Sequence, residues 1–285
     1  MMQRVSTNYI SQHSISRINQ SSVDVHKSDM QVSTGLKAEK FSEVADDLSQ
    51  ILTVEESGLK LESYGKNMLN TESHLNSVET AIQSMQTILT EASSLATLAL
   101  NENTPEDRAS LAATAKGLAQ NLESLMNQQF QGKYIFSGQA TNVPPVGTPS
   151  SPTAFAGMPA ATTYYDGDSE KLSTIVADNT VIDYGITGDN QAFADLKGGI
   201  EALWFGLEND DKASLTGGLD LINNAQTGFG SMIGTIGGEM KQVDILQAQN
   251  DNAKDFLASQ LQELQGVDSA KAISELQQNQ AVLDA

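Results

Sequence analysis

The side chains that most often carry enzyme or metal chemistry are few in this sequence. It contains no cysteine and only three histidines, His13, His26 and His74. A metal site needs several His, Cys, Asp or Glu ligands at defined spacings, and no histidine here has a second one at such a spacing. Each lies beside polar residues in a segment of helical composition. We therefore predict that all three are solvent-exposed surface histidines.

The acidic run from Asp166 to Glu170 is the best candidate for a bound cation. Alternating carboxylates in a turn can gather oxygen ligands for calcium, but an EF-hand loop needs glycine at its sixth position and glutamate at its twelfth. Those positions hold Lys171 and Ala177. We interpret the run as a turn between two strands.

Two other patterns could indicate a reactive or phosphate-binding site. Gly167-Asp168-Ser169 resembles the nucleophile motif of one esterase family, but a serine nucleophile needs a base and no histidine follows His74. The glycine-rich stretch 228–238 lacks the Lys-Ser or Lys-Thr pair of a phosphate loop. We interpret it as a flexible break or loose helical turn before the last long helix. We predict no catalytic residue, no cofactor and no metal, and a protein that is not an enzyme.

The clearest element is a long helix that ends near Asn101. Thr104 is then suited to cap a second helix, with Pro105 at its first position and two acids, Glu106 and Asp107, near its positive end. The spacing predicts a helical hairpin. The first helix has an unbroken apolar stripe of Leu75, Val78, Ile82, Met85, Leu89, Ala92, Ala96 and Ala99, and the second has Leu111, Ala115, Leu118, Leu122 and Leu125.

Both ends of the chain carry thinner stripes with heptad spacing, interrupted by polar residues. The first comprises Ile15, Ile18, Ser22, Val25, Asp29, Val32 and Leu36. The second comprises Val243, Leu246, Asn250, Ala253, Leu257, Gln260, Leu264 and Val267, then shifts near Gly266 before Ile273, Leu276, Gln280 and Leu283. Such narrow stripes are marginal alone, so we expect them to pair and neighbouring subunits to complete their burial. The predicted assembly interface is Ile15, Ile18, Val25, Val32, Leu257, Leu264, Ile273 and Leu276.

The middle of the chain differs from both flanks. Five of the six prolines fall between residues 144 and 159, and residues 162–165, 172–176 and 180–184 read as short strands parted by turns. The predicted fold class is mainly α, a long helical rod or coiled coil formed from both termini with a small inserted β-rich domain at 136–190.

Charge and hydropathy exclude several functional classes. With 36 acidic and 16 basic residues the formal charge is −20, so the surface repels phosphate backbones and we expect no nucleic-acid partner. No apolar run approaches 18 residues, and no apolar segment follows Arg4. We therefore expect neither a membrane span nor a cleavable secretory signal peptide.

The N-terminal motifs resemble those of the bacterial flagellin superfamily. Arg4-Val-Ser-Thr-Asn8 is similar to that family's opening motif, and Gln31-Val-Ser-Thr-Gly35 to the element that follows it. Asp46-Asp47 stands where the family carries an acidic step, although the sequence around Glu43 diverges.

A second block resembles the hook-filament junction branch of that superfamily, the hook-associated protein 3 family. It comprises Glu106-Asp-Arg-Ala-Ser-Leu111 and Gln129-Phe-Gln-Gly-Lys-Tyr-Ile-Phe-Ser-Gly138, followed by Thr141. Filament flagellins usually lack the Tyr-Ile-Phe-Ser-Gly run. Tyr164-Tyr-Asp-Gly-Asp168 is also similar to that branch, and the resemblance covers about half of the chain. Family members normally continue past the element here at 276–285 with a further apolar helical stretch.

The resemblance implies a layered organisation, a structural role and a location. Residues 1–45 would pair with 255–285 as an inner coiled coil, 46–135 with 191–254 would form a helical rod, and 136–190 would face outward. It implies a structural adaptor between hook and filament, exported by the flagellar type III pathway and located outside the cell. The implied partners are further copies in a ring, the hook-side junction protein, flagellin and an export chaperone. The alternatives are a minor filament flagellin, a secreted enzyme on a flagellin-like frame, and an intracellular coiled-coil adaptor.

Overall fold

The computed structural model describes residues 2–38, 47–101, 103–159 and 164–284, and in them the chain is mainly helical. The elements are α1 (Met2–Thr34), α2 (Leu48–Ala99), α3 (Pro105–Met126), β1 (Gln129–Phe130), β2 (Lys133–Tyr134), β3 (Leu172–Ala177), β4 (Thr180–Tyr184), α4 (Gln191–Asn209), α5 (Lys212–Gln265) and α6 (Ser269–Asp284). The strands form two antiparallel pairs, β1-β2 and β3-β4. The predicted fold class, mainly α with a small β insert, is confirmed.

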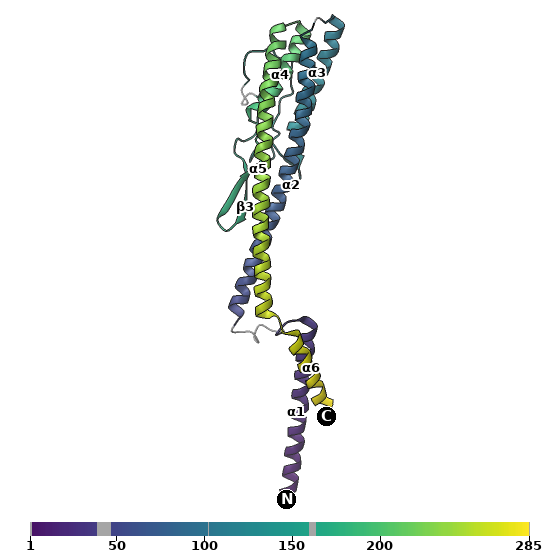
Figure 1. Ribbon diagram of the computed structural model, residues 1–285, viewed down its shortest axis with the longest axis vertical. Coiled ribbons are helices and arrows are strands. Elements are labelled where there is room, and N and C mark those ends of the chain that lie inside the picture. The colour runs from purple at the N-terminus through teal and green to yellow at the C-terminus, as the bar shows by residue number, and fades with distance from the viewer. Residues whose placement is uncertain (1, 39–46, 102, 160–163, 285) are drawn as a thin grey trace. The chain divides into compact units, whose positions relative to one another are not determined.

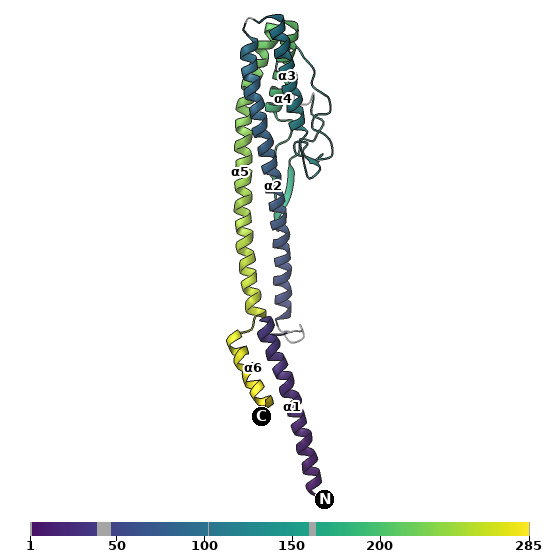
Figure 2. The same ribbon diagram turned by 90° about the vertical axis from the view of Figure 1, so that its right-hand side faces the viewer.

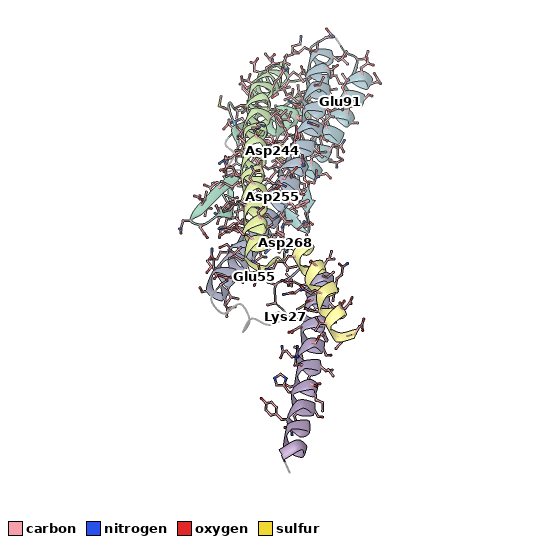
Figure 3. All side chains as sticks on the ribbon, turned by 60° about the horizontal axis from the view of Figure 1, so that its bottom comes forward. Lys27, Glu55, Glu91, Asp244, Asp255 and Asp268 are labelled. Carbon is pink, nitrogen blue, oxygen red and sulfur yellow. The ribbon has the colours of Figure 1, made fainter. Side chains whose placement is uncertain are left out.

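The chain divides into two compact units, and α2 and α5 contribute to both. One unit is Met1–Ser63 with Asn250–Ala285, and the other is Tyr64–Gln249. The acidic step at Asp46-Asp47 lies outside the described residues except for Asp47. Exposed carboxylates such as Glu91 on α2 and Asp244 and Asp255 on α5 give the helices a charged outer surface (Figure 3).

The unit 64–249 is built around a helical core (Figures 1 and 2). All eight residues of the apolar stripe predicted for 75–99 are buried, and they share one cluster with buried residues of α3, α4 and α5. Three aromatic rings at its centre, Phe136, Phe193 and Phe229, contact edge to face, with centroid separations of 5.3 and 5.6 Å. The predicted hairpin of α2 and α3 is therefore confirmed as part of a larger bundle.

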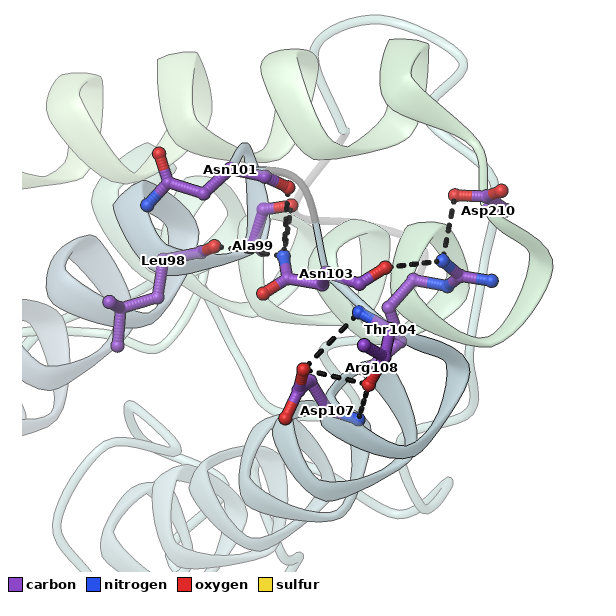
Figure 4. A network of polar contacts seen from close by, with 8 residues as sticks. All are labelled: Leu98, Ala99, Asn101, Asn103, Thr104, Asp107, Arg108 and Asp210. Atoms are coloured by element: carbon purple, nitrogen blue, oxygen red, sulfur yellow. Dashed lines mark hydrogen bonds and ion pairs between the residues drawn. The ribbon is translucent and has the colours of Figure 1, made fainter.

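The turn between α2 and α3 has the predicted cap (Figure 4). The Thr104 hydroxyl accepts a hydrogen bond from the backbone N–H of Asp107, and the Asp107 carboxylate accepts one from the N–H of Thr104. This reciprocal capping box satisfies two donors that the first helical turn would leave unpaired. The Arg108 guanidinium donates to the carbonyl of Asn103 and lies 3.6 Å from the Asp210 carboxylate.

The break predicted at 228–238 is wrong, because α5 runs through this stretch as one helix. A glycine inside a helix costs about 1 kcal/mol relative to alanine. Here Phe229, Met232 and Ile236 lie on one face and are buried in the core, and this packing outweighs the cost. A Cβ on Gly228 would collide with Ala192 of α4, so glycine allows close approach of the two helices.

The β insert is small and shares the helical core. The strands predicted at 172–176 and 180–184 are confirmed as β3 and β4. The strand predicted at 162–165 is reduced to a single bridge from Tyr165 to Val146, and Thr162 and Thr163 lie outside the described residues. Buried residues of the insert belong to the same core cluster as the helices, among them Val146, Tyr164, Val176 and Ile182.

The acidic run of the insert forms a turn, as predicted. The Asp166 carboxylate accepts a hydrogen bond from the N–H of Gly147 at 3.1 Å, and that of Asp168 accepts one from the N–H of Glu170 at 3.0 Å. The Asp166 carboxylate therefore fixes the backbone at Gly147, and the Asp168 carboxylate fixes the backbone at Glu170.

The Gly-Lys-Tyr-Ile-Phe-Ser-Gly run joins the helices to the insert. Gly132 has φ +78° in the tight turn between β1 and β2, after which Ile135 and Phe136 enter the core. Gly138 has φ +61°, and a Cβ there would collide with the backbone carbonyl of Asp168. The N–H of Gln139 donates to the carbonyl of Glu170 at 3.1 Å and fixes this close crossing of two chain segments.

One histidine prediction is wrong. His13 and His26 are exposed as predicted, whereas His74 of α2 is only 8% exposed. Its ring packs edge to face against Phe130 and Tyr184, residues of β1 and β4 that are distant in the sequence. Burial lowers the pKa of His74 from 6.5 to about 4 because the charged form loses its hydration.

We expect Gly138→Ala to destabilise the unit 64–249 much more than Gly132→Ala. Both substitutions place a side chain at positive φ, which costs about 1 kcal/mol or more. Nothing lies within 4 Å of a Cβ at Gly132, but at Gly138 a backbone carbonyl must also move, so we expect a loss of about 3 kcal/mol or more. Urea unfolding, monitored by the fluorescence of the single tryptophan, Trp204, measures the loss of unfolding free energy in each variant. Equal losses in the two variants would contradict this account of the motif.

Candidate assembly interface

A short antiparallel contact joins the two ends of the chain in the unit formed by 1–63 and 250–285. The N–H of Lys37 donates to the carbonyl of Gln265 at 2.8 Å, and the N–H of Val267 donates to that of Gly35 at 2.9 Å. Leu36 and Gly266 form the bridge between them. Gly35 follows α1 with φ +73°, the left-handed conformation that commonly ends a helix. The shift predicted near Gly266 is therefore the break between α5 and α6.

Lys37 caps the C-terminal end of α5. Its ammonium donates to the carbonyls of Glu263 and Leu264, at 2.7 and 3.2 Å. These belong to the last turn of the helix, whose carbonyls have no partner within the helix and carry partial negative charge. Lys37, which lies three residues after the end of α1, thus stabilises the end of α5.

Helices α1 and α6 pack side by side through small and polar residues (Figures 1 and 2). Ala272 of α6 is 1% exposed and Ser28 of α1 is 4% exposed. The Asn279 amide donates to the Ser28 hydroxyl at 3.0 Å, and the Ser21 hydroxyl lies 3.5 Å from the Asn279 carbonyl. Leu276 shares the face of Ala272 and Asn279 by its spacing and is half-buried.

Apolar side chains of the same two helices remain exposed. On α1 these include Ile15 and Ile18, at 59% and 58% exposure, and on α6 they include Ile273 and Val282, at 44% and 61%. An isolated pair of helices gains little from such residues, because their surface stays in water. The small and polar residues between α1 and α6 (Ser21, Ser28, Ala272 and Asn279, here called the polar seam) thus cover one another. The apolar residues remain exposed and are available to a partner.

A second apolar surface lies between the first turns of α2 and the last turns of α5. It is an open groove of about 620 Å³ whose apolar lining comes from Val54, Leu59, Leu257, Ala258 and Leu261. The carboxylates of Glu55 and Glu62 and the ammonium of Lys254 also line it. Phe256 on the neighbouring face of α5 is 63% exposed.

The eight predicted interface residues lie in this unit but not in one patch. Ile15, Ile18, Val32 and Ile273 are exposed, whereas Val25, Leu257, Leu264 and Leu276 are half-buried. Leu257 lines the groove against α2, and Leu276 lies on the face of α6 that meets α1. Their role in assembly stays a prediction.

Sequence reasoning missed the residues that form the seam. The heptad reading placed Ser22 and Asp29 in it, but both are exposed, and Ser21 and Ser28 one position earlier take their places. A signal was present, because burying a serine hydroxyl costs far less than burying a carboxylate.

The comparisons with known proteins agree with the predicted resemblance. Residues 5–141 match the family model of the bacterial flagellin N-terminal helical region. This segment is therefore similar to the N-terminal helical region of bacterial flagellin. It contains α1, α2, α3 and the Gly-Lys-Tyr-Ile-Phe-Ser-Gly run, so the resemblance to the flagellin superfamily is confirmed. No curated protein matches the sequence.

Solved structures of flagellar proteins share the fold. A protein of Vibrio parahaemolyticus named as a flagellar hook-associated protein is 19% identical, covers 79% of this chain and 100% of its own, and has a TM-score of 0.66. FlgL of Bacillus cereus is 17% identical, with coverages of 73% and 98% and a TM-score of 0.60. Flagellar hook-associated protein 3 of Legionella pneumophila is 14% identical, with coverages of 75% and 98% and a TM-score of 0.61.

None of the helices in the described ranges has the length and apolar character that crossing a membrane requires.

Two neighbouring residues of α6 should separate packing within the chain from exposure to a partner. Ala272→Glu places a carboxylate in the seam with α1 and should drive the two helices apart, whereas Ile273→Glu places it in water. The chain has no cysteine, so Gln20→Cys and Gln280→Cys, both at exposed positions, allow one nitroxide label on α1 and one on α6. Pulsed electron paramagnetic resonance then measures the distance between the two labels. We expect Ala272→Glu to lengthen and broaden the distance distribution and Ile273→Glu to leave it unchanged. An unchanged distribution in Ala272→Glu would show that the seam does not hold the helices.

Proposed function

We propose that this protein is a structural component of the bacterial flagellum that joins the hook to the filament and assembles through the helices at its two ends. The observation that carries the proposal is the exposure of apolar residues on α1 and α6 while a small polar seam pairs the two helices. A chain built to act alone would bury Ile15, Ile18 and Ile273 before Ser28. The flagellin N-terminal region at 5–141 and the fold shared with hook-associated proteins support the same role.

The proposal includes partners and a location. Further copies of the chain in a ring would cover the exposed stripe of α1 and α6, and the hook-side junction protein and flagellin would contact the two faces of that ring. A flagellar export chaperone would hold the terminal helices before export through the type III pathway, and the protein would act outside the cell at the hook-filament junction. We propose no cofactor, no metal and no enzymatic activity.

The proposed layers follow the resemblance. Residues 1–45 with 255–285 would form the inner coiled coil, 46–135 with 191–254 the rod, and 136–190 the outer part. The pairing of α1 with α6 supports the first assignment, because it joins the two terminal segments in one chain.

A minor filament flagellin is the second candidate, because the matching family region is described as one of bacterial flagellin. The two roles differ in location. A junction protein is confined to one end of the filament, whereas a minor flagellin is distributed along it.

The proposal is tested in a strain that lacks the gene and is complemented with wild type, Ile273→Glu or Val181→Glu. Val181 is a matched control, since it is an exposed apolar residue, at 56%, on β4. We expect export in all three strains, attached filaments with wild type and Val181→Glu, and at least about tenfold fewer with Ile273→Glu, because a charge buried at an interface costs more than 1.4 kcal/mol. Normal attachment of Ile273→Glu would contradict the interface, and labelling along the whole filament would favour the second candidate.

A further inference from the structure

One face of α2 holds the β3-β4 hairpin. Tyr64, Asn67, Thr71 and His74 recur at helical spacing, and each contacts the hairpin. The Tyr64 hydroxyl donates to the Asp178 carboxylate at 2.7 Å, and the Asn67 amide donates to the Ile175 carbonyl at 2.9 Å. The Thr71 side chain is hydrogen-bonded to the Tyr184 hydroxyl. The hairpin has only two strands and would be marginal by itself, so these contacts, together with the burial of Val176 and Ile182 in the core, hold it in place.

His74 is the innermost residue of this stripe. Its ring centroid lies 5.4 Å from that of Tyr184 and 6.0 Å from that of Phe130, edge to face in both cases. Its Nδ1 is buried and has no hydrogen-bond partner in the described part of the chain. A neutral imidazole can leave one ring nitrogen as an unpaired acceptor at modest cost. An imidazolium has an N–H on both nitrogens, so protonation would bury a charged donor without an acceptor.

The charged groups around His74 do not compensate that charge. Lys171 lines the same small enclosure as His74, and its ammonium forms an ion pair of 2.7 Å with the Glu239 carboxylate of α5. The second oxygen of Glu239 accepts a hydrogen bond from the N–H of Gly185 at 2.8 Å. The group of β4 that faces the ring is the Tyr184 phenol, whereas the Asp183 side chain of the same strand is exposed. Phe130 is the aromatic neighbour from β1. Both oxygens of Glu239 are therefore already engaged, by Lys171 and by the N–H of Gly185.

We propose that the β3-β4 hairpin is an acid-released element, held on α2 while His74 is neutral and freed when His74 is protonated. Release moves Tyr184 and Gly185 away from the ring and lets the imidazolium reach water. The inference concerns the unit 64–249 alone and does not depend on the proposed function. It adds a second conformation to the part of the chain that carries the hairpin.

The direction of the effect follows from linkage. With the hairpin closed, burial holds the pKa of His74 at about 4, whereas an exposed histidine has its ordinary value near 6.5. Between these values the open state binds more protons, so lowering the pH favours it. The equilibrium constant for opening should rise about tenfold for each pH unit within this window and stay constant above it.

Hydrogen exchange of the full chain measures the opening. Protection factors of amides in 172–184, corrected for the intrinsic pH dependence of exchange, are compared between pH 7.5 and 5. We expect them to fall about tenfold per pH unit below 6.5 in the wild type, while amides of α4 keep their protection. In His74→Phe, which keeps an aromatic ring and cannot be protonated, the protection of the hairpin should not change with pH. Substitution of an exposed histidine, His26→Phe, is the control and should behave as wild type.

Two results would overturn the proposal. One is a loss of hairpin protection with falling pH that is equal in wild type and His74→Phe, and the other is a loss that disappears in Glu239→Gln but persists in His74→Phe. If His74→Phe does not fold, the wild type alone decides the question. Its His74 imidazole C–H resonance should titrate well below the ordinary histidine value near 6.5, in step with the exchange of 172–184, and titration of His74 at that ordinary value would refute the mechanism.

Discussion

The arrangement of this chain depends on how much apolar surface each helix offers and where that surface can be buried. In the unit 64–249 the stripe of α2 is continuous, and α3, α4 and α5 cover it, so residues from Leu75 to Ala99 are removed from water. In the unit formed by the chain ends, α1 and α6 have narrow stripes and meet through Ser28, Ala272 and Asn279. Hydrophobic burial is the main favourable term in folding, at about 25 cal/mol per Å². The unit 64–249 can therefore obtain its stability from its own chain. The unit formed by the chain ends leaves part of its apolar surface in water and does not gain that stabilisation.

The elements that could be predicted from the sequence are those whose signals are local. The stripe of α2, the Thr104 cap and the strands β3 and β4 depend on spacing and turn chemistry within a few residues. The missed features depend on distant partners. His74 is buried by Phe130 and Tyr184, and Gly228 lies inside a helix because Ala192 packs against it. The unfavourable helix propensity of glycine, about 1 kcal/mol, determines whether a helix breaks only where tertiary packing does not outweigh it.

The candidate interface was predictable as a region but not as a set of contacts. The helical pattern placed α1 and α6 correctly, and the shift near Gly266 marked the break between α5 and α6. The heptad reading failed by one position at Ser22 and Asp29, because an apolar pattern interrupted by polar residues does not fix the rotation of a helix. Specific hydrogen bonds fix it instead, between Asn279 and Ser28 and between the backbones of Gly35 and Val267. The Asn279–Ser28 pair is polar and the Gly35–Val267 bond is between backbone atoms, so no hydrophobic pattern could identify these contacts.

A polar seam between the terminal helices also suits a chain that must change partners. Each hydrogen bond in the seam adds only about 0.5–1.5 kcal/mol, since water offers equivalent bonds when the helices separate. Burying Ile15, Ile18 and Ile273 against a neighbouring molecule would each add roughly half of the about 1.5–3 kcal/mol of complete burial, because about half of each side chain is exposed. Contacts between chains could therefore add at least as much stability as the hydrogen bonds of the seam supply within one chain. Under the proposed function, the ends would be loosely paired in the free protein and fixed when a second surface covers their exposed residues.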